Sequence, residues 1–259
     1  MLPNTNGGIY KMPIIPSREF NKIYKHHFSE IFLPMGFKMN KNAFYRLCDG
    51  VVQVFNLRTY SFNNNCDFCF MLIPTSSAMH EFYLEDYGTS RLRSIPGFAH
   101  RWTREELLNT NFSEPIEITS KYVVPFFERG VDIKSACQTE MDIELALYKR
   151  IDSCNNYYWY FALQMKDYEM ALRHKRAVYE FNKDSYEEKL NDDERSEEVK
   201  NRIRKERAEL ESSIQKLECR DPKYIASLEK MVAENEKKTM EFLESVAKKP
   251  RKPKKRTDE

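Results

Sequence analysis

Apolar residues recur at helical spacing soon after the start of the chain. They are Phe20, Ile23, Tyr24, Phe28, Ile31 and Phe32. Steps of three and four residues predict an amphipathic helix, which Ser17 can cap and which Pro34 and Gly36 end. The residues before it hold three prolines and two glycines. They are expected to form an irregular lead-in.

The spacing then changes to that of β-strands. Segments 42–47, 51–60 and 66–73 are rich in aromatic and β-branched residues, and Asp49-Gly50 between the first two is a hairpin signal. A fourth strand is expected at 82–87. Because the connections are short, the strands are predicted to pair antiparallel.

From Thr103 onward the pattern is helical again. Thr103 and Glu106 have the spacing of a capping box. Thr139 fits the cap of a helix, and Asp167 fits the start of a long one. Helices are expected at 116–129, 142–150 and 157–165 and after Asp167.

Two charged helices with narrow apolar seams are expected near the C-terminus. Asp221 fits an N-cap between them, and Pro222 fits the first helical position. The pattern predicts that residues from about 194 to 247 form an antiparallel helical hairpin that packs like a coiled coil. The polar residues Asn235 and Thr239 interrupt its seam.

This order of elements predicts an α+β fold. An N-terminal helix and a small antiparallel sheet with flanking helices are followed by an α-helical C-terminal region. The expected parts are the lead-in 1–16, the α+β module 17–152, the helical region 153–247 and a disordered tail 248–259. A chain of 259 residues with 41% hydrophobic content has room for one or two domains.

Charge is nearly balanced over the chain but concentrated at its end. The sequence has 42 Lys and Arg against 40 Asp and Glu, whereas residues 248–259 hold seven basic and two acidic residues. Such a tail can bind polyanions, including nucleic acids, by counterion release. It can equally be a solubilising tail, which the absence of a basic stripe elsewhere favours. Its basic residues are Lys248, Lys249, Arg251, Lys252, Lys254, Lys255 and Arg256.

Six cysteines bear on compartment and metal binding. The N-terminus does not have the pattern of a signal peptide, and no run of about 20 apolar residues occurs, so a cytoplasmic protein with reduced thiols is expected. Cys66 and Cys69 have the spacing of a zinc or redox pair. However, a strand directs them to opposite faces, and a zinc site needs further ligands. We therefore expect core thiols, no metal and no cofactor.

No catalytic motif is recognisable in the sequence. It contains no Gly-rich phosphate loop, no Gly-x-Ser-x-Gly and no His-Glu-x-x-His, and its five histidines show no functional spacing. The polar strand residues Arg46, Gln53, Asn56 and Arg58 are candidate ligand-binding residues. They can line a concave pocket on one face of the sheet, or they can form its solvated face.

The N-terminal part resembles the uncharacterised bacterial family called domain of unknown function 4304. The matching residues are Phe32-Leu33-Pro34, Gly36-Phe37-Lys38, Phe44-Tyr45-Arg46, the strand 52–57, Phe68, Phe70 and Pro125-Phe126-Phe127. The likeness covers about residues 17–150. It implies an α+β fold and a bacterial origin, but no activity and no catalytic residues.

A shorter likeness lies in residues 157–190, where Ala162, Tyr168, Ala171 and Leu172 are similar to part of a tetratricopeptide repeat. No second copy follows at the 34-residue period, and a single unit cannot bury its own faces. A helical hairpin is therefore expected rather than a repeat array.

Three functions follow as hypotheses. The first is a non-catalytic interaction protein, whose sheet module binds a protein partner and whose C-terminal helices support contacts or self-association. The second is a small-molecule binder or enzyme with its site at the polar strand residues. The third is weak nucleic-acid binding through the basic tail. The absence of catalytic motifs favours the first.

Overall fold

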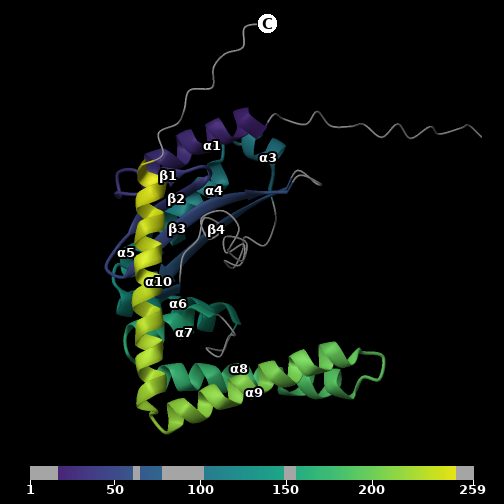
Figure 1. Ribbon diagram of the computed structural model, residues 1–259. Helices are drawn as coiled ribbons and strands as arrows, with labels where there is room; N and C mark the ends of the chain where they lie inside the picture. The colour runs from purple at the N-terminus through teal and green to yellow at the C-terminus, as the bar shows by residue number, and fades with distance from the viewer. Residues whose placement is uncertain (1–16, 61–64, 78–101, 149–155, 249–259) are drawn as a thin grey trace, which may run out of the picture.

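The computed structural model describes residues 17–60, 65–77, 102–148 and 156–248. Its centre is a five-stranded antiparallel sheet with helices on both faces, so the predicted α+β fold is confirmed (Figure 1). In sheet order the strands are β1 (Lys38–Asn40), β2 (Ala43–Leu47), β3 (Val51–Thr59), β4 (Asn65–Pro74) and β5 (Trp102–Thr103). The lead-in 1–16, the expected strand 82–87 and residues 249–259 lie outside the described residues.

The three central strands follow the predicted hairpin order. The β2–β3 turn is closed by a hydrogen bond from the Cys48 N–H to the Val51 carbonyl (2.8 Å), and Gly50 has a φ of +71°. A positive φ strains most residues but not glycine, which explains the Asp-Gly signal. Strands β3 and β4 then pair from Val51↔Pro74 to Thr59↔Cys66.

Helix α1 (Ser17–Phe32) covers one face of the sheet through a stripe of aromatic residues. Phe20, Tyr24, Phe28 and Phe32 recur every four positions and are fully buried. Phe28 and Phe32 lie over Phe55 of β3, with ring centroids 5.1 and 4.7 Å apart. Aromatic pairs in this range add to the free energy gained by burying their surface, so α1 is held firmly.

Short helices continue on this face: α3 (Arg104–Asn109), α4 (Ser113–Ile118) and α5 (Val124–Arg129). The capping box of Thr103 and Glu106 is present as predicted. The helix expected at 116–129 is instead divided into α4, a π-helical segment at Thr119–Val123, and α5. Pro125 lies in the first turn of α5, where its missing N–H is tolerated.

Helix α6 (Ile133–Tyr148) begins nine residues earlier than the prediction of 142–150. Its cap is Asp132, whose Oδ1 accepts from the N–H groups of Lys134 and Ser135, both at 2.9 Å. Thr139 lies inside the helix and is buried. The cap assigned to Thr139 was wrong because Asp132 offers the same chemistry about two turns further back.

Four helices complete the chain: α7 (Asn156–Gln164), α8 (Tyr168–Asn191), α9 (Glu197–Glu218) and α10 (Pro222–Lys248). The predicted caps are confirmed, since Asp167 accepts from Met170 N–H (2.9 Å) and Asp221 from Tyr224 N–H (3.0 Å). The helical hairpin, however, is formed by α8 and α9 (Figure 1). The predicted pairing of α9 with α10 over 194–247 is wrong.

Helix α10 instead crosses the second face of the sheet (Figure 1). Its Phe242, Leu243 and Val246 pack against an apolar sheet surface that includes Val52 and Val54. Without α10 these valines would face water, and burying apolar surface is worth about 25 cal/mol per Å². A sheet therefore competes better for the apolar seam of α10 than the charged α9 does. The second half of α10, from Asn235 onward, thus packs against the N-terminal module.

A polar knot anchors α10 to the sheet. We give this name to the buried turn η1 (Thr75–Ser77) and its hydrogen-bond partners Gly50, Tyr160, Gln164, Asn235 and Thr239. The Thr239 hydroxyl donates to the Thr75 carbonyl and the Asn235 amide to the Ser76 carbonyl, both at 2.9 Å. Gln164 Nε2 donates to the Gly50 carbonyl at 3.0 Å. The polar residues that interrupted the predicted seam therefore fix the position of α10.

Replacing Thr239 with valine is expected to lower the free energy of unfolding by about 1–2 kcal/mol. The substitution keeps the shape of the side chain but leaves the buried Thr75 carbonyl without its hydroxyl donor. Urea unfolding followed by circular dichroism measures the loss. Ser245→Ala is the matched control, because the Ser245 hydroxyl bonds to Phe242 within the exposed part of the same helix. Equal stability of the two variants would contradict the anchoring role.

Candidate functional site

The four predicted ligand-binding residues do not share one face of the sheet. Arg46 and Gln53 lie opposite each other on β2 and β3. Both turn toward the face of α1 and α5. Asn56 is an odd number of positions from Gln53, so Asn56 and Arg58 turn toward the other face. A single pocket lined by all four residues is therefore wrong.

Arg46 and Gln53 form a structural bracket. Gln53 Oε1 accepts from Arg46 Nε (3.0 Å) and Nη2 (2.7 Å), and Gln53 Nε2 donates to the carbonyls of Phe127 (2.7 Å) and Gly130 (2.9 Å). Arg46 Nη1 also donates to the Met35 carbonyl at 2.5 Å. Gln53 is fully buried, and all its hydrogen-bonding capacity is used within the protein. The bracket joins two strands to the turn after α1 and to the end of α5, and Gln53 has no hydrogen-bonding group left for a ligand.

Asn56 and Arg58 belong to a second polar group, which we call the polar end of the sheet: Asn56, Arg58, Tyr60 and Asp67. The Arg58 guanidinium lies 5.5 Å from the centroid of the Tyr60 ring, and the Tyr60 hydroxyl donates to Asp67 Oδ2 at 3.0 Å. Asp67 and Asn56 are buried, whereas Arg58 is half-buried. A carboxylate beside a phenol can bind a cationic group.

A groove opens on the face of the sheet that α10 covers, at the β1–β2 edge and far from the polar end. It has a volume of about 390 Å³ and lies between the β1–β2 edge and the last turns of α10. Its apolar lining consists of Tyr45, Leu47, Met240, Leu243 and Ala247, and Lys38, Arg46 and Glu244 also contribute. Leu47 and Met240 are about 40% exposed. No local sequence pattern indicates this groove, because its two walls lie about 200 residues apart in the chain.

The α8–α9 hairpin, which we call the arm, projects from the body beside the first turns of α10 (Figure 1). Side chains bridge its two helices: Arg176 to Glu218 at 2.7 Å and the Tyr179 hydroxyl to Glu211 at 2.9 Å. Exposed ion pairs contribute little stability, but they fix the register of the helices. On α8, Phe181 is 57% exposed, and Ala177 and Val178 on the same side of the helix are half-buried.

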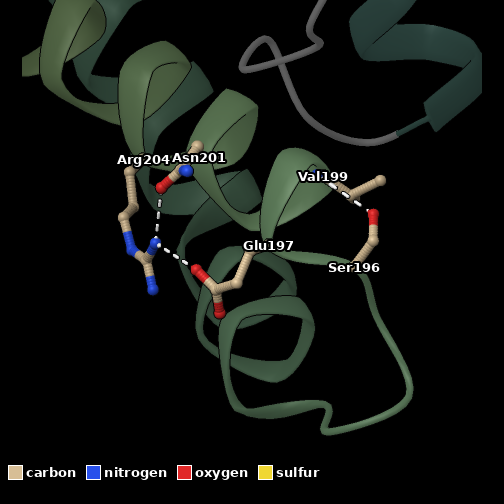
Figure 2. A network of polar contacts seen from close by, with 5 residues as sticks. All are labelled: Ser196, Glu197, Val199, Asn201 and Arg204. Atoms are coloured by element: carbon tan, nitrogen blue, oxygen red, sulfur yellow. Dashed lines mark hydrogen bonds and ion pairs between the residues drawn. The ribbon is translucent and has the colours of Figure 1, made fainter.

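The tip of the arm is held by polar contacts (Figure 2). The Ser196 hydroxyl caps α9 by accepting from Val199 N–H at 3.4 Å. Arg204 Nη1 reaches Glu197 Oε2 at 3.2 Å and Asn201 Oδ1 at 2.7 Å. These contacts connect the first two turns of α9 to one another within the chain.

The thiols and histidines do not form a reactive site in the described part of the chain. Cys66 and Cys69 lie on opposite faces of β4, as predicted, and burial raises the pKa of Cys66 to about 12. The described cysteines are free, and no cluster of three or more His, Cys, Asp or Glu side chains suited to a metal occurs among the described residues. His27 pairs with Asn111 (2.9 Å), whereas His174 is buried in α8.

Comparisons with family models, curated proteins and solved structures find no match for this chain. The resemblance to domain of unknown function 4304 therefore stays a prediction. No helix in the described ranges is long and apolar enough to cross a membrane. The predicted polyanion-binding residues 249–256 lie outside the described residues, and the side chain of Lys248 is not described.

Proposed function

We propose that the protein is a non-catalytic interaction module whose body and arm are both binding surfaces for proteins. The observation that carries this proposal is the arm itself. Two helices of 24 and 22 residues extend beyond the sheet and its covering helices, and over most of their length they pack only on each other (Figure 1). An extended pair of helices that adds little to the core is explained by contacts outside this chain.

The charge pattern of the arm indicates a protein partner or a second copy of this chain. Its helices mix acidic and basic side chains, with pairs such as Arg202–Glu206 and Lys205–Glu209 at 3.9 Å. Such a surface has no single-sign field for a polyanion. The apolar side chains Val178 and Phe181 are the kind of residue that anchors a protein interface.

A small-molecule or enzymatic function remains the alternative proposal, and the polar end of the sheet is its best location. Asp67 and Tyr60 are held together there by a 3.0 Å hydrogen bond. The candidate nucleophiles Cys66 and Cys137 both have a pKa of about 12 because burial disfavours their thiolates. These thiols are therefore poor nucleophiles, and the Asp67–Tyr60 pair supports ligand binding more than covalent catalysis. Free cysteines are consistent with the cytoplasmic location that we also propose.

Phe181→Glu is expected to abolish association through the arm. A charge at the centre of an apolar contact must be desolvated without a partner, which weakens an interface at least about tenfold. Light scattering of the full chain over a concentration series measures self-association, and cross-linking in lysate reveals other partners. Leu145→Glu is the matched control, since Leu145 is 49% exposed on α6, which is not part of the arm.

The outcome that supports the proposal is association that Phe181→Glu removes and Leu145→Glu leaves intact. If the chain is monomeric at every concentration and forms no cross-link that depends on Phe181, the arm is not an interaction surface.

A further inference from the structure

The β1–β2 edge of the sheet is unusually one-sided in charge. Residues 31–48 contain Lys38, Lys41 and Arg46 but no aspartate or glutamate, although the whole chain is nearly balanced with 42 basic and 40 acidic residues. Lys38 and Arg46 line the groove beside α10 together with one acid, Glu244, and the Arg46 guanidinium is bonded to Gln53 and to the Met35 carbonyl. This edge therefore attracts acidic segments and repels a second copy of itself.

The same edge offers backbone groups to an extended chain. β1 pairs with Ala43, Phe44 and Tyr45 of β2, and among the described residues no strand pairs with its other side. An open edge presents N–H and C=O groups on which another strand can form hydrogen bonds. Lysine at such an edge also protects it from aggregation, but that role does not require an apolar groove beside it.

The groove supplies what a bare edge lacks, which is a place for side chains. Its apolar walls come from Tyr45 and Leu47 on the sheet and from Met240 and Ala247 on α10. A volume of about 390 Å³ accommodates one large side chain and part of its neighbours. In peptide recognition by strand addition, backbone hydrogen bonds give affinity and such pockets give specificity.

We propose that the groove and the β1 edge bind an extended segment of a partner protein, in which acidic residues flank one large apolar side chain. The apolar side chain enters between Leu47 and Met240. Because alternate residues of a strand face the same way, acids two positions before and after it lie on the groove side, within reach of Lys38. This inference rests on the proposed interaction function but uses a different surface from the arm.

The test uses the full chain and a set of capped, fluorescein-labelled pentapeptides of sequence Glu-Val-X-Val-Glu, where X is Leu, Met, Phe or Trp. Fluorescence anisotropy should show saturable binding of at least one of them, weakened by salt. The peptide Lys-Val-X-Val-Lys should bind at least about tenfold more weakly, because it repels the cationic edge. Two further peptides, N-methylated at X or at the Val that follows it, should differ in affinity, because neighbouring N–H groups of a strand point to opposite sides and only one of the two faces the edge.

Two variants locate the site. Met240→Glu places a charge in the groove and should weaken binding of the acidic peptide about tenfold or more. Lys38→Glu should reverse the preference, so that the lysine peptide binds better than the glutamate peptide. Leu145→Glu is the control for adding a charge at an exposed apolar position. Thermal unfolding of each variant verifies folding, and Ala247→Glu replaces Met240→Glu if the latter does not fold.

Binding of an acidic peptide that Met240→Glu removes, with reversed charge preference in Lys38→Glu, supports the proposal. If no acidic peptide binds, if the lysine peptide binds as well as the acidic one, if neither N-methylated peptide is weakened, or if Met240→Glu binds like the unaltered chain, the proposal is wrong. None of these outcomes depends on Phe181, so this test and that of the arm fail independently.

Discussion

Replacing Gln53 with leucine is expected to destabilise the protein by about 3–4 kcal/mol. Leucine fills nearly the same volume but removes two donors and an acceptor from a fully buried position. The carbonyls of Phe127 and Gly130 lose their amide donor, and Arg46 loses its acceptor. Each buried polar group left without its partner costs about 1–3 kcal/mol, although half-buried Arg46 can regain water.

Urea unfolding of the two proteins measures this difference. Gln138→Leu is the matched control, because the Gln138 amide donates to Asp142 at 2.7 Å on the exposed side of α6. It should change stability by less than about 0.5 kcal/mol. If Gln53→Leu were as stable as the control, the bracket would not hold the sheet to α5, and a ligand-binding role for Gln53 would return.

Acidification from pH 6.5 to 4 is expected to destabilise the protein through His174. Burial, and secondarily Lys175, lowers the pKa of His174 to about 4. In the unfolded chain the same imidazole takes up its proton near pH 6.5. Between these values the unfolded state binds more protons, so stability falls as the pH falls. Above pH 6.5 His174 is neutral in both states and costs no stability. By pH 4 its protonation in the unfolded chain lowers the free energy of unfolding by roughly 3 kcal/mol.

The measurement is the pH dependence of urea unfolding for the unaltered chain and for His174→Leu, which cannot take up this proton. The variant should show a shallower fall in stability between pH 6.5 and 4, because it lacks the imidazole that takes up a proton on unfolding. The carboxylates that titrate in this range are common to both proteins and cancel in the comparison. His26→Gln is the control, since His26 is exposed on α1 beside Glu30. Parallel pH profiles for all three proteins would show that His174 is protonated in the folded state.

Local patterns in the sequence predicted much of the fold correctly. The four-residue spacing of the aromatics in α1, the Asp-Gly turn before β3 and the caps at Thr103, Asp167 and Asp221 all appear as expected. These features depend on residues that are neighbours along the chain. Backbone conformation and capping chemistry therefore suffice to predict them.

The candidate site was predicted less well, for a reason that can be named. The sequence shows which strand residues are polar, but not that they share a face. Because side chains alternate along a strand, Gln53 and Asn56 lie on opposite faces of the sheet. Whether a strand glutamine faces solvent or a helix end depends on which helix covers it. Here the turn after α1 supplies the carbonyl of Met35, and the end of α5 supplies those of Phe127 and Gly130. No pattern within β3 contains that information.

The sequence by itself determined which segments are helices and strands, where most of them begin, and that apolar side chains of α10 seek an apolar partner. Only the tertiary structure decided that this partner is the sheet and not α9. An apolar seam specifies burial but not the surface that buries it, since the hydrophobic effect is not directional. The position of α10 is specified by Asn235 and Thr239, whose hydrogen bonds to the carbonyls of Ser76 and Thr75 form when α10 lies on the sheet. In that arrangement only the first turns of α10 contact the arm, and the groove forms beside β1.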